Sequence, residues 1–192
     1  MPATPRARPG RRRDALRAGD GKGFLAHRVT DGSLHLHTAL TVPPEWSESI
    51  DTTDPAAAKA AVLAHFADGN PSLRALVADA DGLLVPRAIH ALPAGHRWDR
   101  VPGVTLLGDA AHLMSLFAGE GVDLAMLDGA EPGRALAAHP GDTEAALTAY
   151  EQALFPRSQA AAAMSAANLQ TGLRADAPQG LLDQFVARHQ AA

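Results

Sequence analysis

One stretch near the middle of the chain, VTLLGDAAHLMSLFAGEGVDLAMLDGA, constrains the fold more than any other. The run over residues 101–107 predicts a buried strand, and Gly108 and Asp109 follow at its carboxyl end. Open α/β folds commonly bind ligands at this end of their strands. The run AGEG then leads into an apolar helix predicted over residues 122–136. The stretch therefore predicts a strand, a ligand-binding loop and a helix in direct succession.

The residue types in this stretch suit a ligand that carries hydroxyls and an anionic group. The Asp109 carboxylate can accept hydrogen bonds from ligand hydroxyls, such as those of a sugar alcohol. The run Ala118, Gly119, Glu120 and Gly121 lets backbone N–H groups come close to a ligand. The positive end of the following helix favours an anion at the same place. A carboxylate, bare amides and a helix dipole together suit a flavin-like cofactor better than a metal ion.

A β-hairpin is predicted in the first third of the chain. Residues 22–29 and 33–42 alternate between apolar and polar side chains, and Asp31-Gly32 between them is a hairpin-turn signal. In the second strand, Leu36 and Leu40 fall on the face opposite His35 and His37. No third ligand is placed beside the two histidines, so we interpret them as solvent-facing rather than as a metal site.

Helices are expected in most of the remaining chain. Asp54-Pro55 and Asn70-Pro71 each place a capping side chain before a proline, which predicts helices from residue 55 to Gly69 and from residue 71 onward. Three further elements are expected: a strand over residues 83–91, a helix over 143–171 kinked or broken at Pro156 and stopped by Gly172, and a short helix over 178–189.

Composition limits the cellular setting and the partners. The chain has no cysteine, which excludes disulfides and thiolate metal sites and favours a cytoplasmic protein. No apolar run reaches membrane-spanning length. Residues 1–17 hold six arginines against Asp14 alone, a balance of +5 in a chain whose net charge is −4. The arm contains no aromatic residue, so we expect a disordered tail over residues 1–19 and no nucleic-acid or membrane partner.

The central motif resembles the second flavin-binding motif of class A flavoprotein monooxygenases, the family of aromatic hydroxylases and tetracycline-inactivating enzymes. Upstream, DGSLHLHTALTVPPEW resembles strands of their substrate-covering sheet, and PRAIHALPAGHRWDRVPG resembles their approach to the motif. The resemblance implies an α+β fold with a mixed sheet. It implies a substrate-covering sheet with helices over residues 20–100, the flavin motif over 101–138 and C-terminal helices over 139–192.

The resemblance also implies a cofactor, a reaction and a site. FAD would bind at Gly108 and Asp109, with Asp109 on the ribityl chain and the backbone of residues 118–121 facing the pyrophosphate and the isoalloxazine ring. The family uses NAD(P)H and O2 to hydroxylate an aromatic or polyketide-like substrate. No catalytic residue and no metal ligand is assigned.

The sequence departs from the family pattern in several places. The family begins with a βαβ unit that carries G-x-G-x-x-G, and the nearest approximation here, GDGKG at residues 19–23, is interpreted as a turn. Leu116, Asp123 and Pro132 stand where relatives usually have proline, asparagine and leucine. We therefore expect a chain that is inactive unless a partner chain supplies the dinucleotide-binding half, and we expect exposed apolar surface around residues 101–107. An unintended gene start is an alternative explanation of the first residues.

Other functions were weighed against this one. A non-catalytic remnant or an aromatic-ligand-binding module is the main alternative. Asp109, His112 and Ser115 could suggest a hydrolase, but the G-x-S-x-G elbow is absent. Four residues could contact an acidic or aromatic ligand but are also typical of surfaces and core edges: Arg87, Arg97, Trp46 and Trp98.

Overall fold

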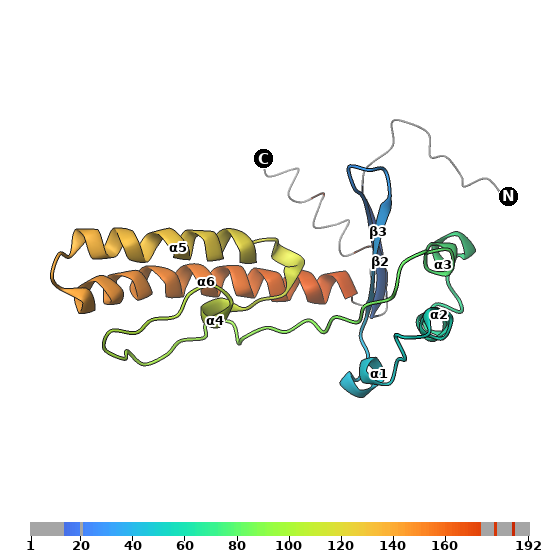
Figure 1. Cartoon of the computed structure of the whole chain (residues 1–192), viewed down its shortest axis with the longest axis horizontal. Coiled ribbons are helices and arrows are strands. Elements are labelled where there is room, and N and C mark those ends of the chain that lie inside the picture. Colours follow the sequence, from blue (N-terminus) through green and yellow to red (C-terminus); the bar gives the residue numbers. More distant parts are fainter. Residues whose placement is uncertain (1–13, 20, 174–178, 180–185, 187–192) are drawn as a thin grey trace. The chain divides into compact units, whose positions relative to one another are not determined.

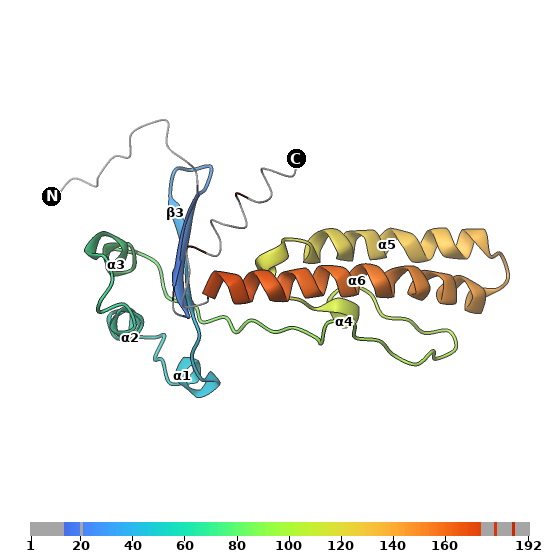
Figure 2. The same cartoon turned by 180° about the vertical axis from the view of Figure 1, so that it is seen from behind.

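The computed structural model describes residues 14–19, 21–173, 179 and 186 (Figures 1 and 2). The chain divides into two compact units, one made of Met1–Arg87 with Gly172–Ala192 and the other of Ala88–Thr171. Residues 1–13 and nearly all of the helix predicted over 178–189 lie outside the described residues. None of the helices in the described ranges is both long and apolar enough to cross a membrane.

The first unit contains a three-stranded antiparallel sheet in the order β1-β2-β3. Its strands are Asp14–Gly19 (β1), Lys22–Arg28 (β2) and Leu34–Leu40 (β3). The predicted hairpin is confirmed, because β2 pairs with β3 and Gly32 in the turn has a φ of 90°. The sheet is antiparallel throughout, which corrects the mixed sheet that was expected. Residues 14–19, assigned above to a tail, form a strand instead.

Three short helices accompany this sheet: Pro44–Glu48 (α1), Pro55–Ala64 (α2) and Pro71–Ala78 (α3). The predicted caps are present, since Asp54 accepts hydrogen bonds from the N–H groups of residues 56 and 57, and Asn70 accepts one from residue 72. Helix α2 ends at Ala64 and not at Gly69, because tighter i to i+3 bonds close its last turn. The core of this unit is built from Phe24, Val62, Phe66 and Val77.

The second unit is mainly helical and carries the central motif. Its helices are Asp109–His112 (α4), a 3₁₀ turn at Leu116–Ala118 (η1), Gly121–Ala138 (α5) and Thr143–Leu173 (α6). Figures 1 and 2 both show α5 and α6 lying side by side, joined by a short turn. Helix α6 continues through Pro156, so the break that was one of the two alternatives there is wrong, and the helix extends to Leu173, two residues beyond the predicted range. Each internal proline removes one backbone hydrogen bond, and packing of the helix pair keeps the helices continuous.

Two predicted strands are absent from the described chain. Residues 83–91 and 101–107 are extended or turning segments, and Val101 and Val104 form only an isolated bridge. A strand exists only where a neighbouring strand completes its hydrogen bonds, and no described strand lies next to either segment. Their apolar side chains remain open, with Leu83 68% exposed and Val104 52% exposed. The exposed apolar surface expected around residues 101–107 is therefore present.

Candidate functional site

The loop between Gly108 and Gly121 is shaped by two glycines with positive φ. Gly108 has a φ of 53° and a ψ of −134° and directly precedes α4. Gly119 has a φ of 74° and ends the η1 turn in the left-handed region. A side chain at either position would strain the backbone, so both turns depend on glycine. The sequence therefore fixes where the chain reverses before α4 and again before α5.

Asp109 is the first residue of α4, and its side chain is exposed. Its carboxylate makes no hydrogen bond or ion pair within the described part of the chain. Gly108 lies against α5, since a Cβ atom built on Gly108 would come within 3.4 Å of the Ala125 side chain. Ala125 is four residues, or about 6 Å of helix axis, from the start of α5 at Gly121. The free carboxylate is thus tethered close to the N-terminal end of α5.

The residues that lead into α5 leave their backbone accessible. Apart from adjacent residues and the backbone of the same helix, no atom lies within 4 Å of a Cβ built on Gly119 or on Gly121. Glu120 occupies the N-cap position without a side-chain capping bond. The first-turn N–H groups of α5 are consequently available to a ligand, and the helix dipole favours an anion there. The acidic Asp123 in the same turn opposes this preference.

A buried carboxylate, Asp128 on α5, supports the loop from behind. Its Oδ2 accepts hydrogen bonds from the Gly108 N–H at 2.9 Å and from the His112 Nε2 at 2.7 Å. Its Oδ1 lies 3.1 Å from the Arg157 Nη2 on α6, and the other arm of Arg157 reaches Glu131 Oε2 at 2.8 Å. Asp128 is fully buried, and His112 is 4% exposed. One carboxylate therefore connects both ends of α4 with α5 and α6.

Sequence reasoning missed Asp128, although a signal was present. Asp128 follows Leu124 by four residues, so it falls on the buried face of α5. An acid at such a position requires a buried partner, because an unpaired charge in the interior is costly. The partners Gly108 and Arg157 are 20 and 29 residues away, and only the tertiary structure reveals them.

The second half of the loop is held by α6. Ser115 and Ser165 are both buried, and their Oγ atoms lie 2.6 Å apart. The Asn168 side-chain amide donates to the Phe117 carbonyl at 3.0 Å. The hydrolase hypothesis requires hydrogen bonds that link the serine, the histidine and the acid. Instead, His112 pairs with Asp128 and Ser115 pairs with Ser165. Asp109, His112 and Ser115 do not form a relay.

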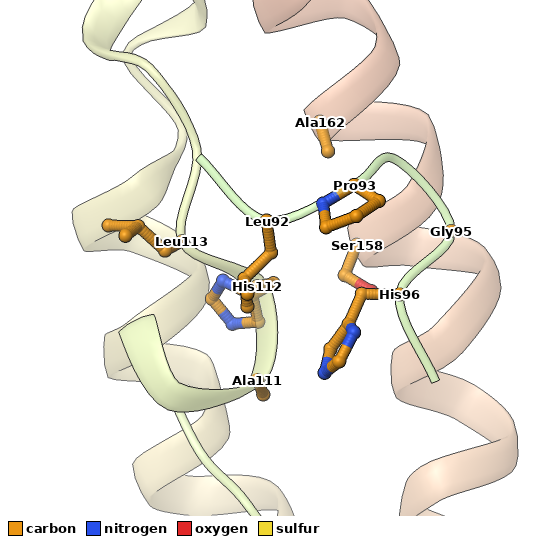
Figure 3. A pocket seen from close by; sticks show the side chains of 9 residues that line it. All are labelled: Leu92, Pro93, Gly95, His96, Ala111, His112, Leu113, Ser158 and Ala162. Carbon is orange, nitrogen blue, oxygen red and sulfur yellow. The ribbon is translucent and has the colours of Figure 1, made fainter. Parts of the chain in front are cut away.

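A small pocket lies behind α4, and Figure 3 shows it from close by. It is lined by Leu92, Pro93, Gly95, His96, Ala111, His112, Leu113, Ser158 and Ala162. The His112 Nδ1 is buried without a hydrogen-bond partner in the structure. The space is on the scale of a water molecule, so it is not a cofactor site.

A second buried acid, Glu151 on α6, organises residues 98–105. Its Oε1 accepts hydrogen bonds from Trp98 Nε1 at 3.2 Å, Arg100 Nη1 at 3.0 Å and Thr105 Oγ1 at 2.7 Å. Arg100 also pairs with the more exposed Glu144, which accepts the Gly103 N–H at 2.6 Å. Side chains of α6 therefore fix this segment in place of strand pairing.

Tyr150 is buried between this segment and Asp128, and it gives a test of pH dependence. Burial, and next the charge of Asp128, raise the pKa of its hydroxyl well above the usual value of 10.0. The folded chain thus favours the neutral phenol over the ionised form. The contribution of Tyr150 to the free energy of unfolding is therefore at its full value below pH 10.0 and declines as the pH rises above it. We expect the free energy of unfolding to fall above that pH, and Tyr150→Phe to weaken the dependence at a neutral-pH cost of about 0.5–1.5 kcal/mol.

Denaturant titrations across this pH range measure the effect. The chain has a single tyrosine, so tyrosinate absorbance follows Tyr150 directly and separates its ionisation from that of the lysines. An ordinary pKa for the Tyr150 hydroxyl in the folded chain would contradict this description of its burial.

The remaining candidates have structural roles or no described partner. Trp98 packs edge-on against Phe155 at 4.9 Å, and Arg97 lies 5.0 Å from the centre of the same ring. Trp46 packs against the core of the first unit. His35 and His37 are exposed residues of β3 whose rings contact the His27 ring of β2. No group of three or more potential ligands in the described residues is arranged to hold a metal.

Comparison with known proteins identifies the family. The fold matches the crystal structure of Klebsiella pneumoniae HpxO complexed with FAD and uric acid, with a TM-score of 0.66 and 22% identity, over 93% of this chain and 44% of that chain. No protein-family model matches the chain. Kynurenine 3-monooxygenase of Salinispora arenicola is 34% identical over 156 residues, which cover 77% of this chain and 32% of that protein.

A third match carries the cofactor in its name. FAD-dependent urate hydroxylase of Mycolicibacterium vanbaalenii is 33% identical over 142 residues, which cover 73% of this chain and 34% of that protein. The chain belongs to the FAD-dependent monooxygenase family and corresponds to a C-terminal portion of its members. It spans about a third of the length of the curated relatives it matches.

Proposed function

We propose that this chain contributes the ribityl- and pyrophosphate-binding part of an FAD site in a flavin-dependent monooxygenase. One observation carries the proposal: the exposed Asp109 carboxylate has no described partner and is tethered beside the uncapped N-terminus of α5. A hydroxyl acceptor and an anion-binding helix end, placed together, fit the sugar alcohol and pyrophosphate of FAD. The family resemblance of the chain supports the same cofactor.

Each residue of the site has a proposed role. Asp109 accepts hydrogen bonds from ribityl hydroxyls, and Gly108 allows the turn that presents it. The backbone N–H groups of Ala118, Gly119, Glu120 and Gly121 face the pyrophosphate and the isoalloxazine ring. Bound FAD supplies electron transfer from NAD(P)H to O2, and the role of these residues is to bind and orient it.

We propose further that the chain works together with a dinucleotide-binding portion, in the same polypeptide or in a partner chain. The relatives are about three times as long as the part that they share with this chain. Residues 105–107 lead directly into the motif but pair with no described strand, and Leu107 is 44% exposed. A sheet in the additional portion would complete these backbone hydrogen bonds. Without it, we expect no oxygenase activity.

An aromatic substrate is the class that the comparisons favour. The matched proteins are named for kynurenine and urate, and the solved relative contains uric acid. Both compounds contain a flat ring system, as do the aromatic substrates implied by the sequence resemblance. By this proposal, residues 20–100 form the substrate-covering part, residues 101–138 the flavin-binding part and residues 139–192 the C-terminal part.

An FAD titration monitored by flavin fluorescence tests the proposal. We expect saturable binding of FAD to the purified chain and much weaker binding of riboflavin, because riboflavin lacks the pyrophosphate that residues 118–121 would contact. Equal binding of both ligands would contradict the proposed role of the α5 N-terminus. No binding of FAD at any attainable concentration would contradict the site itself and favour a non-catalytic remnant.

Asp123→Asn should raise the affinity for FAD. The substitution removes a negative charge from the first turn of α5, where the pyrophosphate would lie. A charge at this position changes anion binding by about 0.3–1 kcal/mol, so we expect a two- to fivefold lower Kd. The matched control is Asp99→Asn, since Asp99 is also exposed but lies outside the loop. An unchanged or higher Kd for Asp123→Asn alone would place the anion elsewhere.

A further inference from the structure

We propose that Asp128 is a positioning residue of the cofactor loop, which holds residues 108–112 in the conformation that presents Asp109. This inference rests on the proposed FAD site for its functional meaning. The positioning role itself is inferred from geometry, because the Asp128 side chain joins the start and the end of α4. Its two oxygens accept from Gly108 and His112 on the loop and from Arg157 on α6.

The two loop contacts lie on either side of Asp109. The Gly108 N–H, held at 2.9 Å, belongs to the residue whose positive φ turns the chain into α4. His112 ends α4, and its Nε2 is held at 2.7 Å by the same oxygen. Since a carboxylate only accepts hydrogen bonds, His112 donates from Nε2, and its buried Nδ1 has no hydrogen-bond partner in the described structure.

Local hydrogen bonds alone give Asp109 little support, since among the described residues its backbone carbonyl accepts only from the Leu113 N–H. Helix α4 has four residues, which is too short for a stable isolated helix, and its N-cap is a glycine without a capping side chain. The Asp109 carboxylate has no partner in the described part of the chain. The conformation of this segment therefore depends on contacts from behind, and Asp128 supplies them from a fully buried position.

A carboxylate is an unusual choice for a residue that only packs two helices. Burying it requires the removal of its hydration, and an apolar side chain of similar volume would often stabilise the helix pair at least as well. What Asp128 adds and an apolar side chain could not is hydrogen bonding, because its carboxylate fixes two N–H donors of the loop at once. Glu131 offers a natural comparison, since it also pairs with Arg157 but makes no hydrogen bond or ion pair with residues 108–112 in the described structure.

Three variants separate positioning from simple helix packing: Asp128→Ala, Asp128→Asn and the control Glu131→Gln. The first readout needs no cofactor: amide hydrogen exchange of Gly108 relative to Leu154, which is fully buried on α6, together with the ring nitrogen signals of His112 in NMR spectra. We expect Asp128→Ala to accelerate Gly108 exchange about tenfold more than Leu154 exchange and to shift the His112 signals. Asp128→Asn keeps one acceptor oxygen and should show a smaller change, and Glu131→Gln should show none.

The second readout is the Kd for FAD, which we expect Asp128→Ala to raise about tenfold and Glu131→Gln to leave unchanged. Gly108 exchange that rises no more than Leu154 exchange, or an equal effect of Glu131→Gln, would overturn the inference. If Asp128→Ala fails to fold, the exchange rates of Gly108 and Leu154 in Asp128→Asn provide the same test. If the unmodified chain binds no FAD, the proposed function fails, and the exchange and ring signals still decide whether Asp128 positions the loop.

Discussion

Glu151→Ala should destabilise the second unit by about 1–3 kcal/mol, the range for leaving buried hydrogen-bond donors without their acceptor. Glu151 is 3% exposed, and one of its oxygens serves Trp98, Arg100 and Thr105. Its loss leaves the indole N–H and the hydroxyl without their acceptor and weakens the attachment of residues 98–105 to α6. Denaturant unfolding followed by Trp98 fluorescence in a Trp46→Phe background isolates this unit, because the chain has two tryptophans.

Two controls make this prediction specific. Glu144→Gln alters the other, half-exposed carboxylate that binds Arg100, and it should have a much smaller effect because solvent screens that pair. Thr105→Val removes a single donor to Glu151 and should cost about 1 kcal/mol. A Glu151→Ala chain as stable as the Glu144→Gln chain would show that residues 98–105 are held by other contacts.

Asp109→Ala should raise the Kd for FAD by about ten- to a hundredfold. The variant removes the one exposed carboxylate at the start of α4, and a hydrogen bond from a hydroxyl to a charged acceptor contributes about 1.5–3 kcal/mol. We expect stability to remain nearly unchanged, because the Asp109 side chain makes no contact that the described fold depends on. Equilibrium titration with FAD and thermal unfolding without FAD measure the two effects separately.

Asp99→Ala is the matched control for this variant. It makes the same chemical change and the same change of net charge at an exposed position outside the loop. The two variants should therefore differ in FAD affinity and agree in stability. Equal affinities would mean that Asp109 does not contact the cofactor, whatever the family resemblance implies.

Local signals in the sequence predicted the elements that local physics determines. The Asp31-Gly32 hairpin and the caps at Asp54 and Asn70 are present because turn and cap chemistry act over two or three residues. The α5 prediction over residues 122–136 falls inside Gly121–Ala138 for the same reason, and the contacts of Asp128 and Glu131 support it despite Pro132.

The failures concern elements that need a distant partner. Residues 83–91 and 101–107 have strand-like composition, but pairing decides a strand, and no described strand lies beside them. Gly108, Asp109 and residues 118–121 could be proposed as a site from the sequence because they lie within one short stretch of it. Their supports, Asp128, Arg157, Ser165 and Asn168, lie on α5 and α6 and could not be linked to the loop before the fold was known.

The most direct test of the FAD site is a map of backbone amide shifts in NMR spectra as FAD is added to the chain. The account predicts that the largest changes fall on Gly108, Asp109 and residues 118–121, and that changes on β2 and β3 are small when no substrate is present. Saturable changes centred elsewhere, or none at these six amides up to the solubility limit of FAD, would contradict it.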